Sequence, residues 1–405
     1  MGNNKRTLVV PMIIVAAMFA VLGFAVGVNA FFIPFVQDAF NISKTMSYLV
    51  MTATFSSFVV FGVPSGMIIK KIGYKGGMVV AFLFMAVGFG LVAPAASLIS
   101  FPLFLMALFI NGMGQTILNT AVNPYITILG PEEGAAARIS IMGICNKLSF
   151  AGASLLLAVF MDLVNVDIAD TIIPFYGIAG ILVVMGILSY FAPLPEVKAA
   201  GEDDGDTTSG ASAYANSKTS ILQFPHLLLG GISLFFYVGV EVIALGTIND
   251  FAKYLELPSP ENYVWFTSAA MVIGYMSGVL LIPKVLSQSL ALKICAVLGI
   301  ITTLAVVFVP VGISIYVVAV LGLANSLMWP AIWPLAIADL GKFTKTGSSL
   351  LVMGIVGGAV LPLIFGYLAD ITSHQMGYWI CFPAYLFILY FAVSGHKVRT
   401  VTVTA

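Results

Sequence analysis

Residues 129–144 read LGPEEGAAARISIMGI, and residues 340–355 read LGKFTKTGSSLLVMGI. Both stretches begin with Leu-Gly and, after the same gap of eleven residues, end with Met-Gly-Ile. Two further pairs recur at nearly the same spacing of about 212 positions: Ser65-Gly66 with Ser277-Gly278, and Gly27-Val28-Asn29 with Gly239-Val240-Glu241. Three matches at nearly one spacing predict a chain made of two related halves.

The composition indicates that these halves lie in a membrane. Hydrophobic residues make up 60% of the 405 residues and charged residues only 8%, whereas a soluble domain has about 25% charged residues. So few charges cannot cover a surface that faces water. The chain has three cysteines and three histidines, without the spacing of a disulfide framework or a metal site. We therefore expect no metal and no cofactor.

Twelve apolar segments of about 20 residues follow one another along the chain. Each can cross a hydrocarbon core of about 30 Å, and a helix satisfies the backbone polar groups of a segment in lipid. The sequence predicts an all-α membrane protein with twelve transmembrane helices, at approximately residues 11–36, 46–69, 78–95, 101–129, 139–161, 171–192, 226–250, 263–282, 291–309, 315–340, 347–368 and 377–395.

Lysine and arginine in the connections give the expected orientation. With a cytoplasmic N-terminus, fourteen of these cations face the cytoplasm, and only Lys44 and Lys253 face the other side. Cytoplasmic loops carry such an excess. We therefore expect both termini to be cytoplasmic in a bacterial inner membrane, with residues 1–192 and 226–405 forming two six-helix bundles. The acidic stretch 193–225 between them is expected to be a flexible cytoplasmic linker.

Polar side chains within the apolar segments mark a candidate site. Asn111, Gln115, Asn119 and Asn123 recur at a spacing of four in one segment, which keeps them near one face of a helix. One amide would suit a bond between helices. Four in line favour a polar cavity, because amides can both donate to and accept from sugar hydroxyls.

Two ionisable residues lie within predicted helices. Lys147 follows the start of its segment by eight residues, and Glu241 is in the middle of another. Charged groups at such depth are costly and are commonly functional. They either take part in coupling to an ion or form a structural ion pair, and the sequence favours neither.

Trp329 and Trp333 lie four apart beside Asn325, Pro330 and Pro334. Tryptophan is also common at membrane interfaces, but these two lie inside a segment. Aromatic rings stack on the apolar faces of sugars, so we expect a sugar site here. The two prolines are expected to bend the helix.

The chain resembles the fucose–galactose–glucose cation symporters of the major facilitator superfamily. The resemblance rests on residues 123–132 (NPYITILGPE) with Arg138 and Asn146, on 72–75, on 239–241, and on 325–330 and 351–370. It implies twelve helices, alternating access and a monosaccharide substrate. Fucose-type members have an acid where this chain has Ala30, and a glutamate where it has Asn119. Both proton-handling acids are therefore replaced.

These observations favour a secondary transporter that imports a hexose such as glucose, galactose, mannose or fucose, with H⁺ or Na⁺ symport. An uncoupled facilitator and a non-transporting sugar sensor are the alternatives. No nucleophile–base pair suggests an enzyme. We expect a monomer whose partners are the sugar and lipid, with no nucleic acid. The expected substrate-binding residues are Asn29, Gln115, Asn119, Asn146, Asn325, Trp329 and Trp333, and the coupling residues are Glu241 and Lys147.

Overall fold

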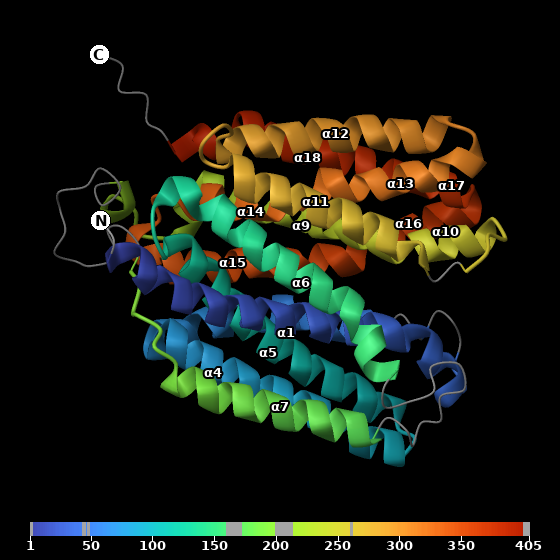
Figure 1. Ribbon diagram of the computed structural model, residues 1–405, viewed down its shortest axis with the longest axis horizontal. Helices are drawn as coiled ribbons and strands as arrows, with labels where there is room; N and C mark the ends of the chain where they lie inside the picture. The colour runs from blue at the N-terminus through green and yellow to red at the C-terminus, as the bar shows by residue number, and fades with distance from the viewer. Residues whose placement is uncertain are drawn as a thin grey trace. The chain divides into compact units, whose positions relative to one another are not determined.

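The computed structural model of the chain describes residues 3–42, 46, 49–158, 172–198, 214–259 and 262–399. Within these ranges all regular secondary structure is helical (Figure 1). The first group of α-helices is α1 Asn3–Ala39, α3 Leu49–Val60, α4 Gly62–Ser97, α5 Phe101–Ile128, α6 Ala135–Ala158 and α7 Ile172–Phe191. The second group is α9 Pro225–Gly246, α10 Ile248–Tyr254, α11 Val264–Leu281, α12 Gln288–Phe308, α13 Val311–Ser326, α14 Met328–Ile337, α15 Thr344–Met353, α16 Gly357–Ile371, α17 His374–Gly377 and α18 Cys381–Val393.

Short 3-10 helices connect or extend these elements, at Glu132–Gly134, Ile221–Gln223, Gly341–Phe343, Gly354–Val356, Tyr378–Ile380 and Gly395–Arg399. Among the described residues, ten helical segments are long and apolar enough to cross a membrane. The helices follow the apolar segments predicted from the sequence. Residues 47–48, 159–161 and 171 of three predicted segments, residues 199–213 of the predicted linker, and Lys44 lie outside the described residues.

Helix α4 contains a break at Gly73. Its backbone there has φ 75° and ψ 173°, a conformation that is costly for any residue with a Cβ atom. The break coincides with the polar connection predicted between residues 69 and 78. At a rise of 1.5 Å per residue, 36 residues would form a helix of about 54 Å. Residues 74–97, after the break, span about 36 Å and can cross a membrane once, whereas residues 62–72 span about 16 Å and continue the predicted segment that begins with α3.

The segment predicted at residues 315–340 is also interrupted. Helix α13 ends at Ser326 and α14 begins at Met328. Pro330 and Pro334, just beyond this break, have no N–H to donate to the preceding turn. The bend expected from the two prolines is therefore present as a break on their N-terminal side.

The chain divides into two compact units, one of residues Met1–Tyr125 with Cys145–Glu196, and one of Ile126–Ile144 with Val197–Ala405. In the first unit α4 packs along α7 (Figure 1). In the second, α12 packs against α13 and α18, and α9 packs against α16. The expected boundaries at residues 192 and 226 remain a prediction.

The sequence repeat reappears in the packing of the helices. In the first unit a Cβ atom at Gly27 would lie 2.5 Å from the carbonyl oxygen of Phe150. In the second, a Cβ atom at Gly239 would lie 2.5 Å from Cδ2 of Leu361. Gly239 and Leu361 follow Gly27 and Phe150 by the repeat spacing. The two repeats therefore share a close contact between equivalent helices, which only glycine allows.

Candidate functional site

The buried carboxylate of α9 is bonded within its own helix. The Tyr237 hydroxyl donates a 2.6 Å hydrogen bond to Oε1 of Glu241, because residues four apart lie on one face of a helix. Glu241 is only 8% exposed and Tyr237 is fully covered. The side chain of Tyr275 on α11 lies close to that of Tyr237. The ionisable group expected from the sequence is thus bonded to a tyrosine of α9, with a second tyrosine, of α11, nearby.

An aromatic cluster adjoins this group. The rings of Tyr237 and Trp329 have centroids 6.1 Å apart, and those of Trp329 and Trp333 are 5.6 Å apart. Trp333 is fully buried, and its indole N–H has no hydrogen-bond partner. Trp329 is half-buried. The two tryptophans predicted from their spacing therefore lie together, with Trp329 next to the tyrosine that holds Glu241.

Asn325 is fully buried and is bonded on both sides of its amide. Its Nδ2 donates to the carbonyl oxygen of Val240 at 3.4 Å, and its Oδ1 accepts from the Tyr385 hydroxyl at 2.8 Å. These bonds tie α13 to α9 and α18. The amide predicted as a sugar ligand thus links helices in this structure, next to the residue that precedes Glu241.

The four amides of α5 form a ladder along the helix. Asn119 Nδ2 donates to the carbonyl oxygen of Gln115 at 3.0 Å, and Asn123 Nδ2 donates to that of Asn119 at 3.0 Å. At the start of the row, Gln115 Nε2 donates to Asn111 Oδ1 at 2.6 Å. Asn111 Nδ2 in turn donates to the carbonyl oxygen of Met85 in α4 at 3.3 Å. Asn111 therefore joins two helices, while Gln115 keeps a buried oxygen without a partner. The polar cavity expected along the row remains a prediction.

Asn29 of α1 is buried and bonded to α3. Its Nδ2 donates to Oγ1 of Thr54 at 2.9 Å, while its Oδ1 has no hydrogen-bond partner. Thr54 also contacts α5, because a Cβ atom at Gly112 would lie 2.6 Å from the Thr54 carbonyl oxygen. The structure therefore brings the surroundings of Asn29 and of the α5 row together at Thr54.

Asn146 and Lys147 are neighbours on α6. Asn146 Nδ2 donates to the carbonyl oxygen of Phe19 in α1 at 3.0 Å. A Cβ atom at Gly23 would lie 2.0 Å from the Asn146 carbonyl oxygen, so α1 and α6 are in close contact here. Lys147 is half-buried. It belongs to the first unit and Glu241 to the second, so the expected ion pair between them remains a prediction.

Basic side chains cap the C-termini of three helices. Lys75 Nζ donates to the carbonyl oxygen of Ala192 at 2.8 Å, just after α7. At the end of α5, Arg138 donates to three carbonyl oxygens: those of Ile126 at 3.0 Å, Thr127 at 2.7 Å and Pro131 at 2.8 Å. Cations at this end satisfy carbonyl groups that have no partner in the helix and oppose the negative end of its dipole.

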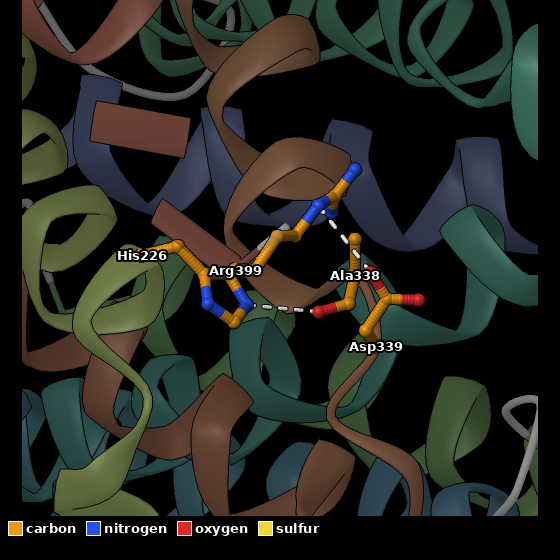
Figure 2. Close-up of polar contacts among 4 residues, drawn as sticks. All are labelled: His226, Ala338, Asp339 and Arg399. Atoms are coloured by element: carbon orange, nitrogen blue, oxygen red, sulfur yellow. Dashed lines mark hydrogen bonds and ion pairs between the residues drawn. The ribbon is translucent and has the colours of Figure 1, made fainter. Parts of the chain in front are cut away.

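The third cap lies at the equivalent position of the other repeat. Figure 2 shows His226 directed at the carbonyl group of Ala338, beyond the end of α14, with Nε2 at 2.9 Å from the oxygen. Because a carbonyl group only accepts, Nε2 carries the proton of this bond. Ala338 follows Thr127 by the repeat spacing, so the same carbonyl group is capped in both repeats. Arginine of α6 does so in one, and histidine of α9 in the other.

An ion pair adjoins this cap. Arg399 Nε lies 3.3 Å from Asp339 Oδ2 (Figure 2), and Asp339 has a backbone φ of 58°. The pKa of the nearby Tyr214 hydroxyl is raised by burial and by the negative charge of Asp339, partly offset by the positive charge of Arg399. The end of α14 thus contacts two other parts of the chain: the end of the predicted linker, through Tyr214, and the segment Gly395–Arg399, through Arg399.

Several of these residues were not singled out as site residues from the sequence. The spacing of four between Tyr237 and Glu241 is a signal that could have identified the tyrosine. Thr54 and Tyr275 lie far along the chain from Asn29 and Glu241, and no sequence pattern links them. Within the described ranges, no three His, Cys, Asp or Glu side chains gather in a way that could hold a metal ion.

The chain is similar to known transporters along most of its length. Residues 14–354 match the sequence model of the Major Facilitator Superfamily. The chain is 32% identical over 393 residues to a glucose/galactose transporter of Brucella abortus biovar 1 (strain 9-941), with 94% of this chain and 92% of the relative covered. It is 24% identical over 428 residues to the L-fucose-proton symporter of Escherichia coli (strain K12), with 99% and 96% covered.

A solved structure supports the fold. The crystal structure of the transporter FucP in the outward conformation matches with a TM-score of 0.80 and 23% identity, covering 98% of this chain and 100% of that chain. The matches confirm the resemblance to fucose–galactose–glucose symporters. Together with the ten apolar helices of the described residues, they confirm a multi-pass protein of the bacterial inner membrane. The chain belongs to the Major Facilitator Superfamily.

Proposed function

We propose that this protein imports a hexose by alternating access, driven by a cation gradient. The observation that carries the proposal is a set of buried polar side chains on helices apolar enough to cross a membrane. They are Asn29 on α1, Gln115 and Asn119 on α5, Glu241 on α9, and Asn325 and Trp333 on α13 and α14. Asn146, on α6, is half-buried. Such groups are costly within lipid, whereas they can form hydrogen bonds with the hydroxyl groups of a sugar. The names of the relatives support glucose, galactose or fucose as the substrate class.

The proposed architecture has twelve membrane crossings in two six-helix bundles. Helix α3 with the part of α4 before the break at Gly73 forms one crossing, and α6 forms another, in addition to the ten apolar segments. The bundles comprise residues 1–192 and 226–405, with 193–225 as a cytoplasmic linker and both termini in the cytoplasm. The protein acts as a monomer without a cofactor or catalytic activity, and its partners are the sugar and lipid.

Glu241 is the proposed coupling residue, and H⁺ is the proposed ion. The carboxylate is nearly enclosed, and it lies beside the aromatic cluster of Tyr237 and Trp329. A proton that reaches it would neutralise the group and change its bond with Tyr237, next to the proposed sugar site. Lys147 is the second charged group of the proposed mechanism, either as a partner of Glu241 in one state or as a fixed charge.

An uncoupled facilitator is the second candidate. It is favoured by the α5 row, which consists of amides where fucose-type symporters have a glutamate, and by Ala30, which follows Asn29 in place of an acid. A facilitator would bind and exchange the same sugars without concentrating them. A sensor that does not transport would bind the sugar without exchange.

Counterflow tests transport itself, whatever drives it. Vesicles that contain the purified protein are loaded with unlabelled D-glucose or D-galactose and diluted into a trace of labelled sugar. We expect transient accumulation of label, with a smaller signal for the Asn119→Leu variant and none for vesicles without protein. Binding without any counterflow would favour the sensor, and neither binding nor counterflow for any hexose would contradict the proposal.

A further inference from the structure

The hydrogen bonds around Gln115 fix the direction in which its amide group points. The Met85 carbonyl group can only accept, so the atom of Asn111 that faces it at 3.3 Å is Nδ2. Asn111 Oδ1 is therefore the atom that faces Gln115 at 2.6 Å, and it requires the Nε2 donor of Gln115. The remaining atom, Gln115 Oε1, is buried and has no hydrogen-bond partner.

The same logic applies to Asn29. Thr54 Oγ1 donates its single proton to the carbonyl oxygen of Val50 at 3.4 Å. It can then only accept from Asn29, whose Nδ2 lies 2.9 Å away. The remaining atom, Asn29 Oδ1, is again buried without a partner. In both residues the amide nitrogen donates to another side chain of the protein, and the amide oxygen accepts no hydrogen bond.

Contacts through Thr54 and Gly112 link the surroundings of the two residues. Gln115 is one turn from Gly112 on α5, and Gly112 lies against the Thr54 carbonyl oxygen and the Ser57 hydroxyl. Thr54 in turn holds Asn29. Gln115 is 0% and Asn29 2% exposed, and a buried acceptor without a donor is unfavourable. A ligand that donates hydrogen bonds would remove this cost at both positions.

We propose that Asn29 Oδ1 and Gln115 Oε1 form an acceptor-only face of the sugar site, so that two sugar hydroxyls must bind there as hydrogen-bond donors. Thr54 and Asn111 are the positioning residues that prevent either amide from presenting its NH₂ group. This inference rests on the proposed sugar transport. It adds which partner donates and which accepts in two of the hydrogen bonds between protein and sugar. It predicts that the site distinguishes a hydroxyl group from fluorine, which cannot donate a hydrogen bond.

The test compares monodeoxy and monodeoxyfluoro derivatives of D-glucose and D-galactose as inhibitors of labelled-sugar exchange. At the two positions whose hydroxyl groups donate to this face, replacing the hydroxyl group with fluorine or with hydrogen should weaken inhibition equally. The expected effect is about tenfold, which corresponds to the loss of one hydrogen bond. At hydroxyls that accept from the protein, the fluoro sugar should inhibit better than the deoxy sugar. Gln115→Glu, which keeps an acceptor oxygen, should bind the parent sugar more tightly than Gln115→Met.

A positioning role is tested by the ratio of fluoro to deoxy inhibition. In Thr54→Val the amide of Asn29 is free to turn, so the fluoro sugar should regain an advantage at one position, while Thr54→Ser should keep the wild-type ratio. Ser57→Ala, whose hydroxyl bonds the Thr54 carbonyl group of its own helix at 2.6 Å, is the matched control and should not change the ratio.

The possible failures are distinguishable. If no hexose is exchanged, the proposed transport fails. If exchange is normal but fluoro sugars equal the parent sugar at every position, the acceptor-only face is wrong. A third outcome is that all deoxy and fluoro sugars inhibit exchange as well as the parent sugar, while Gln115→Met abolishes a dependence of exchange on Na⁺. The two oxygens would then hold a cation, and the proposal would also be overturned.

Discussion

The Tyr237 hydroxyl and the Glu241 carboxylate, one turn apart on α9, are joined by a hydrogen bond of 2.6 Å. Glu241 follows Asn29 by the repeat spacing, so equivalent positions hold an amide in one repeat and an acid in the other. Asn29 is bonded to Thr54 of a neighbouring helix, whereas Glu241 is bonded within its own helix. The two repeats thus share backbone packing and differ in the chemistry of this position.

Replacing the acid tests its role in coupling. Glu241→Gln should keep sugar exchange across vesicles and lose accumulation driven by a pH gradient, because the amide cannot release and regain a proton. Glu133→Gln, which changes an exposed acid, should keep both activities. If Glu241 is only structural, Glu241→Gln should also reduce exchange, and Glu241→Gln combined with Lys147→Met should partly restore it. That pattern would contradict the coupling role.

The close contact between α1 and α6 predicts a large effect of one methyl group. In Gly23→Ala the added Cβ would lie 2.0 Å from the Asn146 carbonyl oxygen, so the helices must move apart. Overpacking of this kind costs about 1–3 kcal/mol, and the thermal midpoint in detergent should fall. Gly180→Ala on α7 has no atom within 4 Å of its added Cβ and is the control, since its midpoint should stay or rise slightly. Equal midpoints for both variants would argue against the contact.

The cap of α5 predicts that arginine cannot be replaced there. Arg138→Met leaves three carbonyl groups without their donor, which should cost roughly 3 kcal/mol. Arg138→Lys should recover only part of this, because one ammonium group cannot reach three oxygens in the same geometry. The exposed Lys71→Met should change stability by less than about 0.5 kcal/mol. Thermal unfolding of the three variants measures the difference, and full stability of Arg138→Met would show that the cap is dispensable.

The tryptophan pair predicts where an aromatic ring matters for the sugar. Trp329→Ala should weaken sugar affinity by about tenfold, since one sugar–aromatic contact is worth about 1.4 kcal/mol on the scale of aromatic pairs. Trp265→Ala and Trp379→Ala, which change exposed rings, should have little effect. Fluorescence titration of variants that keep a single tryptophan gives the answer. A sugar-dependent signal from Trp265 alone would be incompatible with the proposed site.

His396 predicts a loss of stability in weak acid. Burial lowers the pKa of this histidine below its ordinary value of 6.5. The hydrogen bond to the Phe391 carbonyl group opposes this shift in part, and the positive charges of Lys397, Arg399 and Lys293 add to it. Below about pH 6.5 the unfolded chain therefore binds more protons than the folded one, so stability falls as the pH falls from 6.5 toward the folded pKa. His396→Gln should show a smaller decrease of the thermal midpoint between pH 7.5 and 5.5. An identical decrease in both proteins would exclude this contribution.

Much of the fold follows from local patterns. The apolar segments predicted the helices, since lipid requires each segment to satisfy its own backbone. The polar run around Gly73 predicted the break in α4, and the two prolines predicted the interruption before Trp329. The repeat predicted equivalent packing, which appears at Gly27 and Gly239. These features depend on residues close in sequence or on one fixed spacing.

The candidate site was less predictable, because its bonds join distant residues. The row on α5 predicted four polar side chains on one face, but the partner of Asn111 is a backbone carbonyl group of α4, which no side-chain pattern reveals. Asn325, which is predicted as a sugar ligand, accepts a hydrogen bond from Tyr385, 60 positions away, and no sequence pattern links the two residues. The direction of each amide group depends on such partners, and so does the polarity of the site.

Accumulation of labelled sugar under an imposed gradient tests gradient-driven import most directly. Vesicles containing the purified protein receive a proton gradient, acidic outside, or a Na⁺ gradient of the same size, and labelled D-glucose or D-galactose is added outside. The account predicts that the internal concentration rises above the external one under the proton gradient, and that a protonophore abolishes this rise. Exchange without accumulation under either gradient would contradict it and would identify the protein as a facilitator.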